Sequence, residues 1–137
     1  MTRLSNAALR QLPAAVARPF YDRCSLRTGI LHLGLGAFHR AHQAPLTETC
    51  LNAGAREWGI AAASLRRADT RDALGPQDGL YTLALRQGGS QALQVIGALT
   101  RILVAPENPQ ALLAAMTDPD LRIVSLTVTE KDRKSVV

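Results

Sequence analysis

Short apolar blocks alternate with glycine-rich and polar segments along the chain, and the spacing within each block predicts an element. Residues 30–33 (Ile-Leu-His-Leu) follow a glycine and fit a strand that is buried on both faces. A glycine turn at residues 34–36 comes next, and residues 37–53 carry apolar side chains at helical spacing, with Gly54 as a stop. Pro45 lies inside this helix, so we expect either a kink or a first turn that ends before it.

A second strand is predicted over residues 58–65, and a polar stretch, residues 66–79, follows it. Strand, glycine turn, helix and strand together make a βαβ unit, whose crossover is right-handed in nearly all proteins. Two further apolar runs, residues 80–86 and 92–104, flank a Gly-Gly pair. This arrangement predicts a β-hairpin.

The last third of the chain predicts one helix and one strand. The helix begins at Asn108 and runs through Met116. Residues 121–128 have the β-branched run of a central parallel strand. Thr129 and Glu130 then stand at the carboxyl end of this strand, where open α/β sheets bind ligands.

Together these elements predict an α/β fold, an incomplete Rossmann-type doubly wound parallel sheet with an inserted β-hairpin. A short helix over residues 5–12, capped by Ser5, and a surface connection through residue 28 precede the sheet. The 137 residues suffice for one domain with a modest core.

Composition narrows the possible functions. Hydrophobic residues make up 47% and charged residues 20%, as in soluble globular proteins. No apolar run approaches the ~20 residues of a membrane helix, and the first residues do not form a secretory signal, so we expect a cytoplasmic protein without a membrane partner. The net charge of +5 comes from scattered arginines and aromatic residues are only 4%, which makes a nucleic-acid-binding domain the least favoured alternative.

Histidines and cysteines give no metal or redox motif. His39 and His42 can share one helix face, but no third ligand is near them or near His32. Cys24 and Cys50 are far apart and form no C-x-x-C pair. We therefore predict no metal site and interpret the histidines as packing or surface groups.

The glycine turn is the strongest candidate for ligand binding. Gly34 allows the tight turn, and Gly36 lets a pyrophosphate approach the backbone at the start of the following helix, where free amides and the helix dipole bind anions. His39 stands where a dinucleotide fingerprint has its third glycine, which implies looser packing or a helix tilted away from the strand. The alternative is a glycine-rich turn without a ligand.

The segment after the second strand bears on the choice of dinucleotide. Asp69 is the nearest acid that could hold an adenosine ribose. Arg66 and Arg67 precede it, and an arginine here can stack on adenine or bind a 2′-phosphate. These residues leave NAD and NADP both open, and Arg67 fits a solvated loop at least as well.

Six segments in unchanged order carry a resemblance to the N-terminal domain of the mannitol dehydrogenase family, the polyol-specific long-chain dehydrogenases that include fructuronate reductase. They are LPAAVARPFYDR (12–23), GILHLGLGAFHRAHQA (29–44), WGIAAASLR (58–66), QDGLYTL (77–83), VIGAL (95–99) and RIVSLTVTEK (122–131). In this family G-x-G-x-F-H-R replaces the three-glycine form. The resemblance therefore assigns five residues to its cofactor loop, namely Gly34, Gly36, Ala37, Phe38 and Arg40.

The resemblance implies a nicotinamide dinucleotide cofactor, NAD with NADP not excluded. The implied reaction is a hydride transfer that interconverts a sugar alcohol or sugar acid and its keto form. The family's catalytic lysine and asparagines lie in or next to a second, helical domain whose signatures this sequence lacks, so we predict no catalytic residue in this chain and an inactive fragment. The alternative is a stand-alone nucleotide-binding or regulatory module without catalysis.

These observations divide the chain into three parts. Residues 1–28 are an N-terminal extension and residues 29–131 an incomplete dinucleotide-binding domain, with the helical catalytic domain absent. In the family the TVTEK segment continues with Gly-Tyr, whereas residues 132–137 here can be encoded by a common sequencing adapter. We interpret these last residues as a non-native tail.

Overall fold

A four-stranded parallel sheet forms the centre of the computed structural model, which describes residues 3–128. Its strands are β1 (Thr28–Leu33), β2 (Gly59–Ser64), β5 (Leu99–Val104) and β6 (Ile123–Leu126), in the spatial order β5-β2-β1-β6. Neighbouring strands all pair in parallel. The chain steps from β1 to β2 to β5 and then crosses back to β6, so the winding reverses between β1 and β6. The predicted α/β fold with a doubly wound parallel sheet is confirmed.

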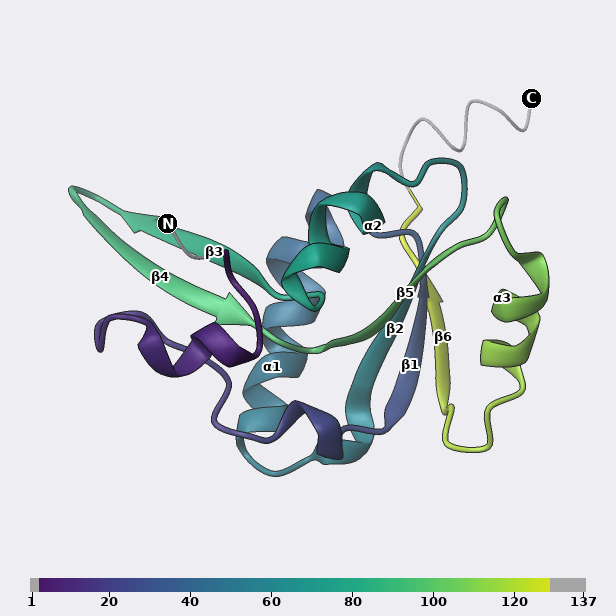
Figure 1. Ribbon diagram of the computed structural model, residues 1–137, viewed down its shortest axis with the longest axis horizontal. Helices are drawn as coiled ribbons and strands as arrows, with labels where there is room; N and C mark the ends of the chain where they lie inside the picture. Colours follow the sequence, from purple (N-terminus) through teal and green to yellow (C-terminus); the bar gives the residue numbers. More distant parts are fainter. Residues whose placement is uncertain (1–2, 129–137) are drawn as a thin grey trace.

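Helices cover both faces of this sheet. α1 (Ala44–Asn52) and α2 (Asp69–Leu74) lie on one side and α3 (Pro109–Met116) lies on the other (Figure 1). Because successive side chains of a strand point to opposite faces, the apolar strands contribute to two separate cores. The core on the α1 side includes Ile30, Leu51, Ile60 and Leu99, and the core on the α3 side includes Leu31, Ala61 and Ala115.

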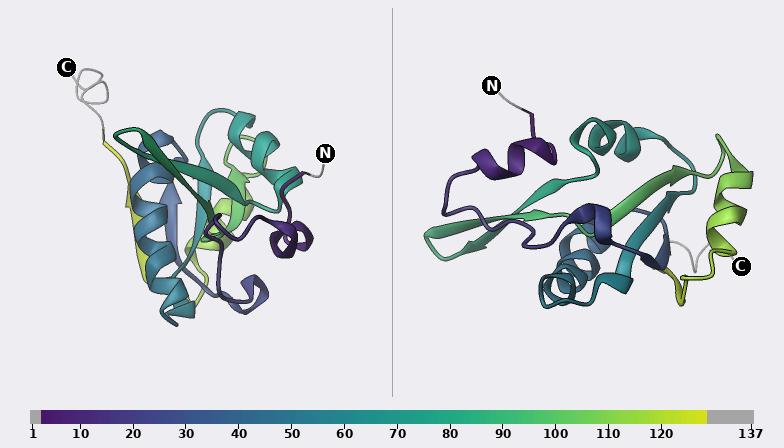
Figure 2. Two further views of the ribbon diagram at one scale, coloured as in Figure 1. Left: turned by 90° about the vertical axis from the view of Figure 1, so that its left-hand side faces the viewer. Right: turned by 60° about the horizontal axis from the view of Figure 1, so that its bottom comes forward.

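An antiparallel hairpin of β3 (Tyr81–Gln87) and β4 (Ser90–Ile96) extends away from the parallel sheet beside the N-terminal segment (Figure 2). The prediction of one hairpin strand over residues 92–104 was wrong, because the chain leaves the hairpin at Gly97 and enters the parallel sheet as β5. Gly97 packs tightly here: a Cβ on it would lie 2.8 Å from Pro19 Cγ. The close approach of the N-terminal segment therefore explains both the glycine and the break between the strands.

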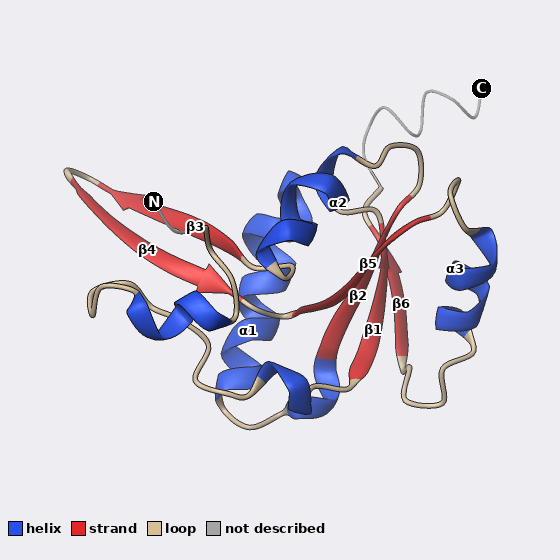
Figure 3. Ribbon diagram, in the orientation of Figure 1, coloured by secondary structure: helices blue, strands red, loops and turns tan. Residues whose placement is uncertain are grey.

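Three other predictions needed correction (Figure 3). The polar stretch 66–79, in which no element was predicted, contains α2, whose six residues are too few to show a helical pattern. The strand predicted over residues 121–128 is shorter at both ends, since β6 covers Ile123–Leu126. The N-terminal helix is a 3-10 turn, η1 (Ala7–Gln11), in which Ser5 Oγ accepts a hydrogen bond from the Ala8 amide at 3.2 Å.

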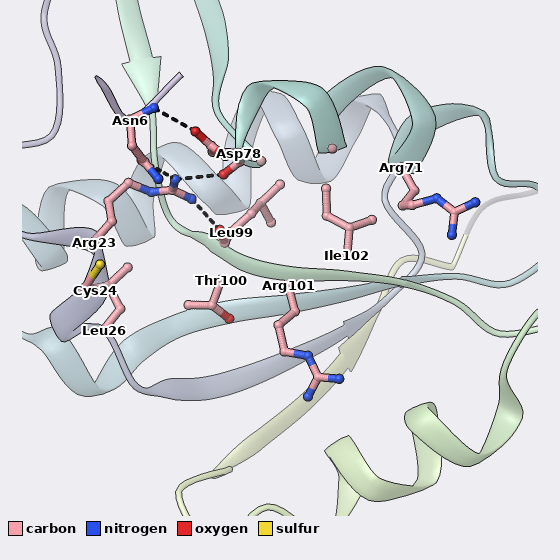
Figure 4. Close-up of a pocket in the computed structure, with 12 residues that line it drawn as sticks. Asn6, Arg23, Cys24, Leu26, Arg71, Asp78, Leu99, Thr100, Arg101 and Ile102 are labelled. Atoms are coloured by element: carbon pink, nitrogen blue, oxygen red, sulfur yellow. Dashed lines mark hydrogen bonds between the residues drawn. The ribbon is translucent and has the colours of Figure 1, made fainter. Parts of the chain in front are cut away.

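Arg23 fastens the N-terminal segment to the rest of the fold (Figure 4). It follows Asp22, which caps the short 3-10 turn η2 (Arg23–Ser25) by accepting a hydrogen bond from the Cys24 amide. Its guanidinium donates to four oxygens from separate parts of the chain, namely Gly97 O at 3.0 Å, Asp78 O at 2.7 Å, Leu99 O at 2.7 Å and Asn6 Oδ1 at 2.7 Å. One side chain thus joins η1, the turn before β3, and the junction of β4 and β5.

A buried carboxyl beside Arg23 adds a second connection. Glu48, on α1, is fully buried, and its Oε1 accepts a hydrogen bond from the Tyr21 hydroxyl at 2.6 Å. Its Oε2 accepts one from the Gly97 amide at 3.1 Å. Burial raises the pKa of Glu48, although these hydrogen bonds and the charge of Arg23 oppose that shift. The N-terminal segment is therefore part of the folded core.

β6 is an edge strand within the described residues, and its exposed apolar side chains favour self-association. Val124 and Leu126 are 51% and 58% exposed and pair in register with Leu31 and Leu33, which places them on the α3 side of the sheet. We expect a V124K/L126K double variant to aggregate at higher concentration than the unsubstituted chain, as measured by light scattering. Leu46→Lys, a comparably exposed leucine on α1, is the control. Equal scattering by all three proteins would contradict the prediction.

Candidate functional site

A backbone hydrogen bond joins the glycine turn after β1 to the neighbouring strand β2. Gly34 has φ +111°, a conformation that side chains rarely adopt, and its amide donates to Ala63 O at 2.7 Å. The fold itself therefore requires a glycine at position 34.

Gly36 has a different reason for lacking a side chain. Its φ lies outside the positive region, and a Cβ built on it would meet no atom within 4 Å. Neither backbone strain nor packing against the described residues requires a glycine here. The open space fits the close approach of a ligand to the backbone, as a pyrophosphate in a dinucleotide turn needs.

Residues 37–52 form one continuous helix, as the sequence predicted, but η3 (His39–Gln43) is a π-helical turn within it. The Ala44 amide bonds to His39 O across this wider turn. Pro45 comes next, and in a regular helix its ring would collide with the carbonyl four residues earlier. The π turn, a known form of local helix irregularity, therefore stands where we expected a kink.

The start of this helix presents unused donors to the space beside Gly36. The first amides of a helix have no partner within it, and the helix dipole makes this end attractive to anions. Ala37 and Phe38 lie here and are exposed. Tyr81 holds the first turns in place, because its hydroxyl donates to Arg40 O at 2.6 Å. Arg40 Nε in turn donates to Gly36 O at 3.3 Å.

Stacked imidazoles fill the contact between helix and strand where a glycine usually stands. His39 and His32 are both buried, and their ring centroids lie 4.0 Å apart with the planes at 13°. The loose packing expected from His39 is therefore not what the structure shows. The interpretation of these two histidines as packing groups is confirmed.

Burial keeps both imidazoles neutral near pH 7. Desolvation lowers the pKa of His32 to about 4, and the neighbouring His39 contributes in the same direction. Desolvation also lowers the pKa of His39, with Arg40 adding to the effect and the hydrogen bond to Gln43 opposing it. Neither imidazole therefore brings a positive charge to this turn near pH 7.

A cleft of about 590 Å³ opens at the carboxyl ends of β1, β2 and β6. Four predicted site residues line it: Gly34, Gly36, Arg66 and Asp69. Three others, Ala37, Phe38 and Arg40, lie on the adjoining helix and do not line the cleft. Thr129 and Glu130 lie outside the described residues. The cleft occupies the place where the winding of the sheet reverses, which is where open α/β folds bind ligands.

Three polar lining residues, Ser64, Thr70 and Thr127, were missed in the sequence. Thr127 follows the last residue of β6, and the overlong strand prediction placed the strand end beyond it. Arg67 also lines the cleft and forms an ion pair with Asp69 at 3.8 Å. Both side chains are highly exposed, so solvent screens this pair and a ligand can exchange for either partner.

Other chemical groups are few in the part of the chain that the structure describes. No set of histidine, cysteine and acidic side chains there could hold a metal ion. Cys24 and Cys50 are free and exposed. No helix among these residues has the length and apolarity needed to cross a membrane.

The parallel sheet, the glycine turn and the helix start beside a cleft define a Rossmann-type fold of the kind that binds nucleotides. Comparison with known proteins identifies the family. The family model for the mannitol dehydrogenase Rossmann domain matches residues 28–135, and the chain belongs to this family.

Relatives with known names support this assignment. The chain is 43% identical over 118 residues to a mannitol 2-dehydrogenase of Pyrenophora tritici-repentis, an alignment that covers 84% of the chain and 21% of that protein. It is 46% identical over 120 residues to a mannitol 2-dehydrogenase of Cereibacter sphaeroides, which covers 85% and 25%. Among solved structures, the Pseudomonas fluorescens mannitol 2-dehydrogenase in ternary complex with NAD and D-mannitol matches with a TM-score of 0.88 at 41% identity, over 94% of the chain and 27% of that protein. The chain thus spans about a quarter of the length of these relatives.

Proposed function

We propose that this chain is the NAD-binding part of an oxidoreductase that interconverts a polyol and its keto form. The observation that carries the proposal is the open space at Gly36 beside an exposed helix start. The relatives support the substrate class, because they are named mannitol 2-dehydrogenases and one was solved with NAD and D-mannitol. These names favour a polyol over a sugar acid. The nicotinamide of NAD, when bound, accepts the hydride from the alcohol carbon.

The residues of this chain divide the binding of the dinucleotide between them. The turn at Gly34 and Gly36 and the amides of Ala37 and Phe38 bind the pyrophosphate. Arg40 follows on the same helix and adds a positive charge nearby.

The adenosine ribose lies against the segment after β2, within reach of Arg66 and Asp69. A carboxylate there accepts hydrogen bonds from a ribose 2′-hydroxyl, whereas an arginine favours a 2′-phosphate, so the same segment decides between NAD and NADP. Thr129 and Glu130, which follow β6 in the sequence, are proposed to contribute to the nicotinamide end of the site.

Catalysis needs groups that these residues do not supply. Oxidation of an alcohol requires a base within hydrogen-bond reach of the hydroxyl and a pocket that orients the substrate against the nicotinamide. The resemblance to the family assigns none of the candidate site residues as that base, and we propose that it comes from outside residues 29–131. The chain alone is therefore expected to bind NAD without oxidising D-mannitol.

Gly36→Val tests the proposed site directly. Gly36 has no positive φ and an added Cβ meets no atom within 4 Å, so the free energy of unfolding is expected to stay within about 0.5 kcal/mol. The side chain fills the space that the pyrophosphate needs, and NAD affinity is expected to fall roughly tenfold or more. Isothermal calorimetry with NAD and with NADP measures the affinity and shows which dinucleotide the chain prefers.

Gly89→Val is the matched control, because Gly89 also has open space around its Cβ position, has no positive φ and does not line the cleft. It should leave binding unchanged. Equal loss in both variants, or wild-type chain that binds neither dinucleotide, would contradict the proposed function.

A further inference from the structure

A proline leaves one carbonyl of the helix after the glycine turn without its usual donor. In the π-helical turn η3 the Ala44 amide bonds to His39 O. In the same i→i+5 register the next carbonyl, Arg40 O, needs the amide of residue 45. That residue is Pro45, which has no amide hydrogen. Since the Ala44 amide is engaged with His39 O, neither of the two nearest helical positions offers Arg40 O a donor.

A tyrosine hydroxyl from the hairpin supplies the missing donor. Tyr81, the first residue of β3, donates from its hydroxyl to Arg40 O at 2.6 Å. Its ring is 8% exposed and belongs to the core on the α1 side of the sheet, which fixes its position. Burial raises the pKa of the Tyr81 hydroxyl, so this group stays protonated and remains a donor near pH 7. The contact therefore replaces the hydrogen bond that Pro45 cannot make.

Arg40 connects this contact to the glycine turn. Its amide donates to Gly36 O at 3.1 Å, and its guanidinium Nε donates to the same oxygen at 3.3 Å. Gly36 lines the cleft, and the exposed residues after it, Ala37 and Phe38, begin the helix. The hydroxyl of Tyr81 is thus linked to Gly36 through Arg40, although Tyr81 itself does not line the cleft.

Loss of the hydroxyl would leave Arg40 O unpaired, and an unpaired, partly buried carbonyl is unfavourable. The first turn of the helix then moves to regain a donor, and the amides beside Gly36 move with it. We propose that Tyr81 is a positioning residue of the dinucleotide turn, whose hydroxyl takes the place of the amide that Pro45 lacks and holds the helix start in the geometry that binds the pyrophosphate. This inference rests on the proposed function, since it adds a support to the same site.

Tyr81→Phe removes the hydroxyl and keeps the ring. Affinity for NAD, measured by isothermal calorimetry, is expected to fall roughly fivefold. Tyr21→Phe is the matched control, because Tyr21 is also 8% exposed and its hydroxyl donates to Glu48 Oε1 at 2.6 Å, while neither of these residues lines the cleft. It should lower the melting temperature of the free chain at least as much and leave NAD affinity within about twofold of wild type. Equal affinity losses in both variants would show that Tyr81 acts only through general stability.

Pro45→Ala tests why the hydroxyl is needed, because alanine restores an amide hydrogen at residue 45. In this background the helix can supply a donor to Arg40 O itself, so adding Tyr81→Phe is expected to cost less than about twofold in NAD affinity. A loss of about fivefold in both backgrounds would show that the hydroxyl does not replace the missing amide. Unchanged affinity on Tyr81→Phe alone would overturn the positioning role.

Nuclear magnetic resonance of the free chain follows the turn without cofactor. The amide resonances of Gly36 and Ala37 should move on Tyr81→Phe and stay in place when the same change is added to the Pro45→Ala variant. Resonances that do not respond to Tyr81→Phe would contradict the inference even if the affinity falls. If these resonances respond as expected but wild-type chain binds no NAD, the proposed function fails and the role of Tyr81 in cofactor binding fails with it.

Discussion

Replacing Arg23 with methionine is expected to lower the free energy of unfolding by about 2–4 kcal/mol, because hydrogen bonds from a charged donor are stronger than neutral ones. The methionine leaves the carbonyl oxygens of Gly97, Asp78 and Leu99 without their donor. It also removes the positive charge that offsets the burial of Glu48. Since these groups belong to separate parts of the chain, their loss loosens the N-terminal segment and the junction of β4 and β5 together.

Denaturant titration followed by circular dichroism measures this effect. Arg101→Met is the control. Arg23 and Arg101 line one pocket (Figure 4), but Arg101 is exposed, and surface changes of this kind cost less than about 0.5 kcal/mol. Arg23→Lys should recover little stability, since an ammonium group cannot span four separated acceptors. Comparable stability of the Arg23→Met and Arg101→Met variants would show that the guanidinium contacts contribute nothing.

Acidification is expected to destabilise the fold through His32. The pKa of His32 is about 4 in the folded state and 6.5 in the unfolded chain. Between these two pH values the unfolded chain therefore binds more protons than the folded one. The stability that His32 contributes to the fold is complete above pH 6.5 and is lost as the pH falls to 4. Its full size is about 3 kcal/mol, because each unit of pKa difference corresponds to about 1.4 kcal/mol. His39, whose pKa is also lowered, acts in the same direction.

Glu48 opposes part of this dependence. Its pKa is raised by burial, so the folded state holds a proton that the unfolded state releases, and stability from this group increases as the pH falls. The difference between wild type and His32→Gln therefore isolates the histidine. Unfolding free energies measured from pH 7 to pH 4 should fall more steeply for wild type. Parallel pH profiles would mean that His32 is not held neutral by the fold.

The first βαβ unit could be predicted from the sequence because its signals are local. The apolar run of β1, the glycines of the turn and the helical spacing after it each depend on neighbouring residues. Gly36 illustrates this well, since its position in the G-x-G pattern already places it beside the helix start. Four of the candidate site residues lie in one cleft because they follow β1 and β2, the two strands of this unit.

Features that depend on contacts between distant parts of the chain could not be predicted from the sequence. The break between β4 and β5 is set by Pro19 and Arg23, which approach Gly97 from the N-terminal segment. The pairing of His32 with Ser125 joins β1 to β6, and nothing in either segment alone specifies it. Thr127 was missed because strand ends are decided by the length of the neighbouring strands rather than by composition.

The contacts of Arg23 and Tyr21 also separate two meanings of a domain boundary. The match to the family model begins at residue 28, where β1 starts. Hydrogen bonds from Arg23 to Asn6 and from Tyr21 to Glu48 place residues before that point inside the cooperative unit. A polypeptide that starts at Thr28 would keep the whole region that the family model matches within the described residues and still lack the groups that close its core, so the matched domain is smaller than the unit that folds.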